Sequence, residues 1–442
     1  MVTPAPLATT RDGLANILKN LAWLIGGKGF GAVCSLVYLA VLARSLGLKN
    51  FGHFSLIFGT GQALVAIAGF QTWQIMVRYG AEPVHQRDWA RFGRLAWLGG
   101  TIDVAGAAVG CVLSFVVYYG FGGTLGLNPA YIDMAFAFSC ALLLARTTTP
   151  NGIVRVLDRF DVGSYVEAVV PAGRLIASGV IAVIGATVGR FLFAWALFDL
   201  VAAALYWYAA WKLVPDALHR SQFGQWRQSL RENPGLGRFF GLAFMGSTLD
   251  AFYKQGPLLA VGYLFGTSAA GLYRLADQLA QGIGKLSGLI TRAVFPEFAM
   301  ARMNRQGRDF SRLVRQVTLM AAGAGVFVVA IALLLGKQVL WLMGGTEFVR
   351  GAPVLVPLAL GAAFELAAVS YEPVLFSTGH AAYAVAVRAL SVLTLGGAIF
   401  AFASSGPVGV GWAVALGLTL VYVAMSLIVR TVLRRIAKGD RA

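Results

Sequence analysis

Twelve long apolar runs dominate the sequence and limit the folds that the chain can adopt. A helix needs about 20 consecutive apolar residues to cross the hydrocarbon core of a bilayer. A transmembrane barrel is excluded because its strands alternate apolar and polar residues, whereas residues 321–336 are continuously apolar. The runs lie at about residues 20–43, 51–78, 94–119, 131–149, 163–187, 190–213, 239–265, 269–297, 313–335, 352–377, 381–402 and 408–430. Since only helices remain as spanning elements, the sequence predicts an all-α integral membrane protein of about 12 transmembrane helices.

The placement of the basic residues predicts the orientation of the chain. A net charge of +17 would suggest a nucleic-acid partner in a soluble protein. With the N-terminus placed inside, however, the cytoplasmic segments hold 24 of the 36 Lys and Arg. The outer loops hold five, which are Arg44, Lys49, Arg190, Lys337 and Arg350. This asymmetry follows the positive-inside rule, so it predicts two cytoplasmic termini and no nucleic-acid partner.

A self-comparison predicts that the chain contains an internal duplication. At an offset of 219 residues, the aligned pairs are Gly47 with Gly266, Gly52 with Gly271, Gln62 with Gln281, and Gly69 with Gly288. Each half would hold six spans, so both halves would have the same orientation and be related by a pseudo-two-fold axis along the membrane normal. The predicted parts are an N-terminal lobe over 1–213, a cytoplasmic linker over 214–238, a C-terminal lobe over 239–430 and a basic tail over 431–442.

The predicted linker has an amphipathic pattern. Its Phe223, Trp226 and Leu230 recur at helical spacing among arginines. This pattern is compatible with a helix that lies on the cytoplasmic face of the membrane and equally with a solvated charged loop.

Charged residues inside the predicted spans are the clearest functional signal, because only 12% of the chain is charged. A charge at the bilayer centre costs about 2.5–3.5 kcal/mol, so these side chains must face protein or a water-filled cavity. On the eighth span, polar residues recur at steps of three and four, which places them on one helical face. With the basic residues of the first and seventh spans, and with Gln62 as the duplicate of Gln281, they form a predicted cationic cavity of Lys28, Gln62, Lys254, Arg274, Gln278, Gln281, Lys285 and Arg292. Such a cavity favours an anion such as phosphate or pyrophosphate.

Some of these residues also have structural explanations that the sequence leaves open. Asp250 and Lys254 are four residues apart and can form an ion pair within one helix. Arg274 and Arg292 lie toward the ends of their span and can reach the lipid headgroups. Lys285 is too deep to do so easily, which favours a position on the substrate path.

Acidic residues within the spans are candidates for proton or sodium coupling, or for charge balance, because burial can bring carboxyl groups into the titrating range. Glu167 and Arg174 lie seven residues apart on one span, and we interpret them as balancing each other structurally. The candidate acidic residues are Asp103, Glu167, Asp199, Asp250 and Asp277.

No enzymatic, metal or cofactor motif was found in the sequence. The glycine-rich segment at residues 26–31 lacks the Ser or Thr that follows the lysine of a phosphate-binding loop. The cysteines lie within spans and the histidines near span ends, without the spacing of a metal site. The sequence therefore predicts a transporter with no catalytic residues and no cofactor.

The sequence resembles the bacterial polysaccharide and O-antigen flippases, a family in the superfamily that also holds multidrug and lipid II exporters. The resemblance is clearest at residues 20–56 (NLAWLIGGKGFGAVCSLVYLAVLARSLGLKNFGHFSL), 69–82 and 269–316, and it continues weakly at 375–392. It implies two six-helix bundles around a central cavity, which the first, second, seventh and eighth helices line. It also implies alternating inward-open and outward-open states, with Arg78 at the cytoplasmic entrance.

The same resemblance implies a substrate and a location. The substrate would be an undecaprenyl-pyrophosphate-linked oligosaccharide that crosses to the periplasmic leaflet of the bacterial inner membrane, with a polysaccharide polymerase and glycosyltransferases as partners. One alternative is a drug or cation exporter of the same superfamily, for which acidic residues should dominate the cavity. Another is a membrane scaffold for polysaccharide assembly, in which the buried charges would serve packing alone.

Overall fold

The computed structural model describes residues 10–146, 148–303, 307–371, 374–375 and 380–437. Apart from short gaps, it describes side chains over 31–282 and 318–433. All regular elements over these ranges are helical, which confirms the all-α prediction. The helices are α1 (Thr10–Ala68), α2 (Thr72–Gln86), α3 (Trp89–Phe115), α4 (Ile132–Leu144), α5 (Thr148–Val156), α6 (Phe160–Ile184), α7 (Val188–Leu213), α8 (Arg220–Phe223), α9 (Gln228–Glu232), α10 (Leu236–Met303), α11 (Gly307–Gly344), α12 (Ala352–Ala367), α14 (Ala381–Phe402) and α15 (Gly406–Ala437).

Short turns of other helix types adjoin these elements. A π-helical turn, η1 (Val116–Gly120), ends α3, and the 3-10 turns η2 (Pro129–Tyr131), η3 (Thr346–Gly351) and η4 (Ala403–Ser405) precede α4, α12 and α15.

Nine stretches of the described chain are long and apolar enough to cross a membrane. The three longest are Gly31–Gln86, Leu236–Gly282 and Ala382–Leu433. Each contains a glycine with positive φ at which one helix ends and the next begins, Gly47, Gly266 and Gly406 respectively, and Gly31–Gln86 is interrupted a second time between Ala68 and Thr72. Dividing these stretches at the three glycines gives twelve segments of the described chain, which is the number of spans that the apolar runs predict.

The glycine breaks also support the predicted duplication. Gly47 (φ 69°, ψ 172°) and Gly266 (φ 81°, ψ −178°) interrupt their helices with nearly the same backbone geometry. A positive φ is strained for residues with a Cβ, which explains glycine at both positions. Gly126 (φ 69°) and Gly345 (φ 88°) form a second pair at the same offset of 219 residues. The two halves therefore repeat their turns as well as their spans.

The chain forms two compact units whose boundaries fall inside α1 and α10. The larger unit comprises Cys34–Arg274 and Trp341–Phe348, and the smaller unit comprises Met1–Val33, Leu275–Leu340 and Val349–Ala442. The lobes predicted over 1–213 and 239–430 are a different division, and they remain a prediction.

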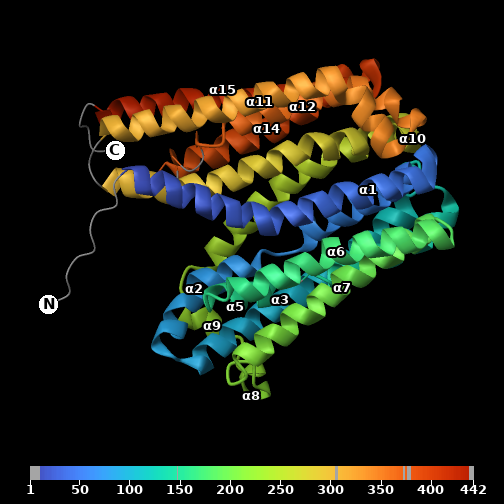
Figure 1. The fold of residues 1–442 in the computed structure, drawn as a ribbon. Helices are drawn as coiled ribbons and strands as arrows, with labels where there is room; N and C mark the ends of the chain where they lie inside the picture. The colour runs from blue at the N-terminus through green and yellow to red at the C-terminus, as the bar shows by residue number, and fades with distance from the viewer. Residues whose placement is uncertain (1–9, 147, 304–306, 372–373, 376–379, 438–442) are drawn as a thin grey trace. The chain divides into compact units, whose positions relative to one another are not determined.

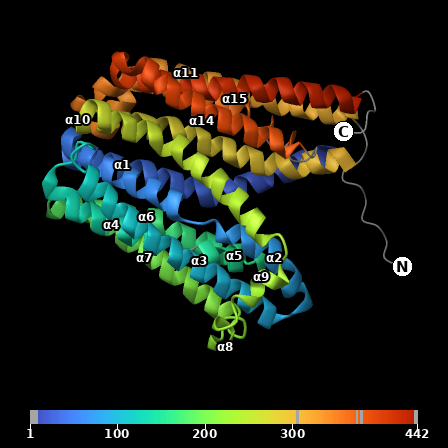
Figure 2. The same cartoon turned by 180° about the vertical axis from the view of Figure 1, so that it is seen from behind.

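In the larger unit, α7 packs against α4, α5 and α6, and α3 packs against α2, α4 and α5 (Figure 2). In the smaller unit, α15 packs against α12 and α14 (Figure 1). Large apolar side chains remain exposed on the helices, for example Val183 on α6 and Phe193 on α7. Such exposure is costly in water but favourable against lipid, as expected for membrane-spanning helices.

The linker at residues 214–238 contains the short helices α8 and α9, and it belongs to the larger unit, where it packs against α2 and α3. Val214, Ala217 and Leu236 join an apolar core with α2 and α3 residues that include Met76 and Phe92. Both ribbon views show α9 beside α2 at the same end of the unit (Figures 1 and 2). The linker is therefore built into the helical core rather than loosely attached to it.

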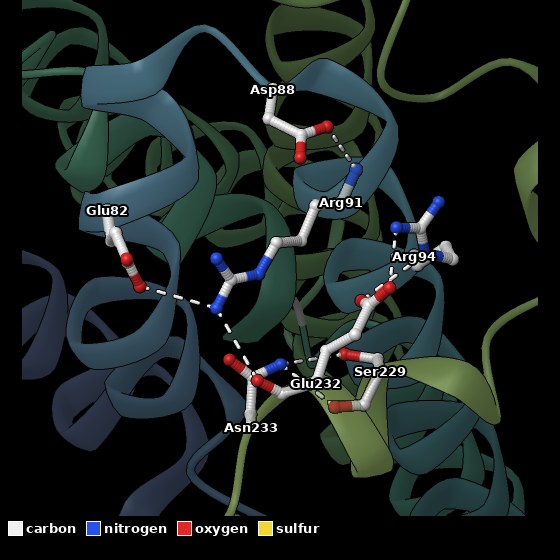
Figure 3. Close-up of polar contacts among 7 residues, drawn as sticks. All are labelled: Glu82, Asp88, Arg91, Arg94, Ser229, Glu232 and Asn233. Carbon is white, nitrogen blue, oxygen red and sulfur yellow. Dashed lines mark hydrogen bonds and ion pairs between the residues drawn. The ribbon is translucent and has the colours of Figure 1, made fainter.

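A network of charged side chains holds α9 against α2 and α3 (Figure 3). Arg94 Nη2 and Nε donate to the two carboxylate oxygens of Glu232, at 2.6 and 3.3 Å. Arg91 Nη2 donates to Glu82 at 3.3 Å and to the Glu232 backbone carbonyl at 3.4 Å. The side chains of Arg94 and Glu232 are only 14% and 18% exposed, whereas that of Glu82 is 61% exposed. The Arg94–Glu232 pair should therefore contribute more to linker docking than the Arg91–Glu82 pair.

We predict that Arg94→Ala makes the linker more susceptible to proteolysis. A hydrogen bond to a charged group contributes about 1.5–3 kcal/mol, so the undocked population should rise roughly tenfold or more. Chymotrypsin cleavage at Phe223 and Trp226 in the purified protein would measure this. The control variant Glu82→Ala should change the rate by less than about twofold. A cleavage rate in Arg94→Ala equal to that of the wild type would show that the pair does not hold the linker.

Candidate functional site

The predicted site residues divide between the two units. The larger unit holds Gln62, Arg78, Asp103, Glu167, Asp199, Asp250, Lys254 and Arg274. The smaller unit holds Asp277, Gln278 and Gln281. Lys28 lies on α1, and Lys285 and Arg292 lie on α10, but their side chains are outside the described part of the chain.

A buried charge pair joins α6 to α7. Arg174, which is 8% exposed, donates from Nη2 to both carboxylate oxygens of Asp199 at 2.9 and 2.8 Å. Its guanidinium also lies over the rings of Trp195 and Phe58, at 5.2 and 5.8 Å from their centroids. Asp199 therefore balances the charge of Arg174, and two aromatic faces stabilise the cation further.

The predicted balance between Glu167 and Arg174 is wrong. Glu167 is instead paired with Arg155, at 3.8 Å, and its side chain is 50% exposed. Residues seven apart are separated by about 10 Å along a helix axis, so a partner on a neighbouring helix can approach more closely. Arg174 finds such a partner in Asp199 on α7.

The Asp103 carboxylate accepts hydrogen bonds from three threonines. Thr72 and Thr148 donate from their hydroxyl groups to Oδ1 at 2.8 and 2.6 Å. Thr149 donates from its backbone N–H and its hydroxyl to Oδ2, at 3.0 and 2.7 Å. Because Thr72 and Thr148 are the first residues of α2 and α5, Asp103 on α3 ties two helix starts together. A carboxylate at these helix N-termini is stabilising, and a role in ion coupling would require these bonds to break.

The second predicted span is broken, which sequence reasoning missed. The apolar run at 51–78 predicts one continuous helix, but α1 ends at Ala68 and α2 begins at Thr72. Arg146 donates from Nη1 to the Val65 carbonyl at 3.0 Å and lies so close to Gly69 that a Cβ there would overlap its Nε. Broken helices often line the substrate site of transporters. The available signal was Gly69 followed by polar residues inside an apolar run.

Among the basic residues on α2 and α10, Arg274 shares the Phe58 ring with Arg174, whereas Arg78 and Lys254 lie elsewhere. Arg78 and Lys254 are exposed. The Arg78 guanidinium lies over the Phe239 ring at 4.5 Å from its centroid, and that of Arg274 lies over the Phe58 ring at 5.4 Å. An aromatic face can hold a guanidinium while its edge remains open to an anion, and the place of Arg78 at an entrance stays a prediction.

On the smaller unit's part of α10, two predicted site residues interact with each other. Gln281 donates from Nε2 to the Asp277 carboxylate at 2.7 Å. Residues four apart lie on the same face of a helix, which allows this bond within one helix.

Comparison with known proteins identifies the family. The model of the polysaccharide biosynthesis protein family matches residues 17–302. The chain belongs to this family. Inner membrane protein YghQ of Escherichia coli (strain K12) is 25% identical over 335 residues, which cover 76% of this chain and 94% of that protein.

Solved structures show the same fold at low sequence identity. An inward-facing multidrug resistance transporter of the MATE family, in the MOP superfamily, has a TM-score of 0.73 at 14% identity and covers 92% of this chain and 96% of its own. The lipid II flippase MurJ, in an inward closed conformation, has a TM-score of 0.69 at 11% identity, with 94% and 89% covered. The chain is thus a multi-pass membrane protein with the two-lobed twelve-helix fold of these transporters, which confirms the predicted fold class and family.

We predict that removing one partner of the Arg174–Asp199 pair lowers the unfolding temperature strongly. Asp199→Leu would leave the Arg174 guanidinium buried without its counter-charge, at a cost of about 3–5 kcal/mol. The double variant with Arg174→Leu should recover much of this loss, because it leaves no isolated buried charge. The more exposed pair provides the control, since Glu167→Gln should cost less than about 1 kcal/mol. Thermal unfolding of the purified proteins tests this, and a double variant that is less stable than both single variants would contradict it.

Proposed function

We propose that this protein is a flippase for lipid-linked oligosaccharides. It would move undecaprenyl-pyrophosphate-linked repeat units from the cytoplasmic to the periplasmic leaflet of the bacterial inner membrane, for the synthesis of O-antigen, capsule or exopolysaccharide. The observation that carries the proposal is the family match, which places the chain in polysaccharide biosynthesis. The similarity of its fold to that of a lipid II flippase supports a substrate that is itself a lipid with a polar headgroup.

The basic residues on the membrane-spanning helices would recognise the pyrophosphate. Lys and Arg donate charge-assisted hydrogen bonds to phosphate oxygens, and these bonds strengthen away from bulk water. Arg78 would make the first contact, and Lys254 and Arg274 would act farther along the path. The oligosaccharide would lie in the water-filled cavity, while the prenyl tail stays in the bilayer. The full proposed set is Lys28, Gln62, Arg78, Lys254, Arg274, Gln278, Gln281, Lys285 and Arg292.

We also propose that transport proceeds by alternating access, with a proton or sodium ion as the coupling species. Asp103, Glu167 and Asp199 have contacts that account for them structurally in the present state. Asp250 and Asp277 also have interactions in this state, including the Gln281 hydrogen bond to Asp277, and they lie on α10, the helix that carries the basic residues. A bound anion near these carboxyl groups would favour their protonated form, so these two are the preferred coupling candidates.

The proposed orientation has both termini in the cytoplasm. It is supported by the excess of Lys and Arg in the loops on that side. The linker and the substrate entrance would then face the enzymes that assemble the lipid-linked unit. Glycosyltransferases would therefore act before this protein, and a polysaccharide polymerase after it.

A second candidate is export of drugs or organic cations, which the similarity to a multidrug transporter favours. A site for cations should be lined mainly by acidic groups, because like charges repel inside a low-dielectric path. The predicted path contains more basic than acidic residues. The charge of the path therefore favours the flippase.

We predict that Lys254→Ala and Lys285→Ala impair surface polysaccharide production in a strain that lacks the native gene. The loss of one charged hydrogen bond to pyrophosphate should weaken recognition roughly tenfold or more. Surface polysaccharide would be measured together with the amount of protein in the membrane, and Lys337→Ala, an exposed lysine in a predicted outer loop, is the matched control. Wild-type polysaccharide levels from both variants would argue against their role, and drug resistance without any polysaccharide defect would favour the second candidate.

A further inference from the structure

Four segments of the larger unit meet at the end predicted to face the periplasm. Two are helix corners, here named the first corner (residues 43–52, around Gly47) and the second corner (residues 262–271, around Gly266). The other two connect spans and are named the first loop (residues 122–129) and the second loop (residues 341–348, which comprise the last turn of α11 and the start of η3). Within each pair, the members are related by the same offset of 219 residues.

The two corners cross each other at backbone distance. A Cβ on Gly52 would overlap the backbone carbonyl of Thr267, and a Cβ on Gly271 would lie 3.0 Å from the Leu48 carbonyl oxygen. Leu48 and Thr267 are equivalent positions of the two halves, as are Gly52 and Gly271. The contact is therefore reciprocal, as a local two-fold axis would produce, and only glycine allows so close an approach.

Each loop contacts the corner of the opposite half. In the second loop, the backbone carbonyls of Trp341 and Leu342 accept hydrogen bonds from Arg44 at 3.1 and 2.9 Å. Glu347 accepts a hydrogen bond at 3.2 Å from the backbone N–H of Leu48, the first residue after the Gly47 break. In the first loop, a Cβ on Gly126 would lie 3.5 Å from the Gly262 carbonyl oxygen, in the second corner.

The charged contacts occur on one side alone. The position equivalent to Arg44 is Tyr263, and the position equivalent to Glu347 is Asn128, whose side chain accepts from the nearby Ala130 N–H. Arg44 meets carbonyls at the C-terminal end of α11, and Glu347 caps a helix N-terminus. Both arrangements have the favourable sign for a helix dipole. The backbone of the crossing is thus symmetric, whereas the charged contacts join the first corner to the second loop and, among the described residues, have no equivalent between the second corner and the first loop.

We infer that the second loop is a latch, closed by Arg44 and Glu347, that holds this end of the protein shut. The glycine crossing supplies shape complementarity, the buried Phe348 ring of the second loop packs on Phe51 of the first corner at 5.4 Å between centroids, and the latch adds the polar contacts. For the proposed flippase, on which this step rests, release of the substrate on the periplasmic side requires the latch to open.

A buried reporter cysteine tests the latch without any substrate. Ala270 lies in the second corner and is fully buried in the closed state. With Cys34, Cys111 and Cys140 replaced, Ala270→Cys in the purified full-length protein should react slowly with a polar thiol reagent. Adding Arg44→Ala or Glu347→Ala should raise its reaction rate roughly threefold or more, because each removes part of the bias toward the closed state. Glu347→Gln, which keeps an acceptor but no charge, should have a smaller effect.

Two controls keep this outcome specific. Arg350→Ala removes an exposed arginine just outside the latch and should leave the rate unchanged. Ala210→Cys, fully buried in the core beneath the linker, should stay unreactive in every variant. An unchanged rate at position 270 in both latch variants would overturn the proposal, as would an equal rise at position 210, since that would indicate general loosening.

The link to transport has its own test. Cysteines at positions 48 and 347, joined by a short bis-methanethiosulfonate through two disulfides, should stop polysaccharide export, and a reductant that cleaves these disulfides should restore it. Normal export with complete cross-linking would refute the need for opening. If the reporter responds as expected while neither wild-type nor variant chains support export, the latch stands and the flippase proposal fails.

Discussion

A charge within the hydrocarbon core must be paired, hydrogen-bonded or kept wet, and this constraint organises the larger unit. Arg174 meets it through Asp199 and two aromatic faces, and Asp103 meets it through donors at the starts of α2 and α5. These satisfied charges also position the helices, since each joins elements distant in sequence. Arg78 and Lys254 remain exposed on the helices that are proposed to line the path. We propose that this difference separates charges that stabilise the fold from charges that would bind a substrate.

The spans were predictable from sequence because hydropathy over 20 residues needs no knowledge of tertiary contacts. The corners at Gly47 and Gly266 were indicated by the repeat, although their shared backbone geometry appears only in the structure. The break between Ala68 and Thr72 was missed because its apolar run continues through it. The partner of Arg174 was wrong because a pattern along one helix cannot show which carboxylate approaches from the next. Within the predicted site, the aromatic ring under Arg78 and the hydrogen bond between Gln281 and Asp277 were not predicted, because a sequence pattern does not show which side chains meet. The side chains of Lys28, Lys285 and Arg292 lie outside the described residues.

The duplication explains why the two halves meet so closely. Equivalent glycines cross at the corners because a two-fold arrangement that places Gly52 against Thr267 also places Gly271 against Leu48, the equivalent of Thr267. Later divergence could alter side chains without changing this backbone, and Arg44 and Glu347 stand where the other half has Tyr263 and Asn128. Symmetric packing therefore sets the shape of this end, and asymmetric charge sets how firmly it is held.

The central claim is that the protein moves a lipid whose headgroup is recognised by its charge. Reconstitution of the purified protein into vesicles tests it most directly, with two lipids that carry the same prenyl chain and oligosaccharide and differ in having a pyrophosphate or a neutral linkage. If the protein recognises the pyrophosphate charge, the pyrophosphate lipid should move between leaflets in a protein-dependent manner that free pyrophosphate inhibits, and the neutral lipid should move little. Equal movement of both lipids, or none above protein-free vesicles with correctly folded protein, would contradict it.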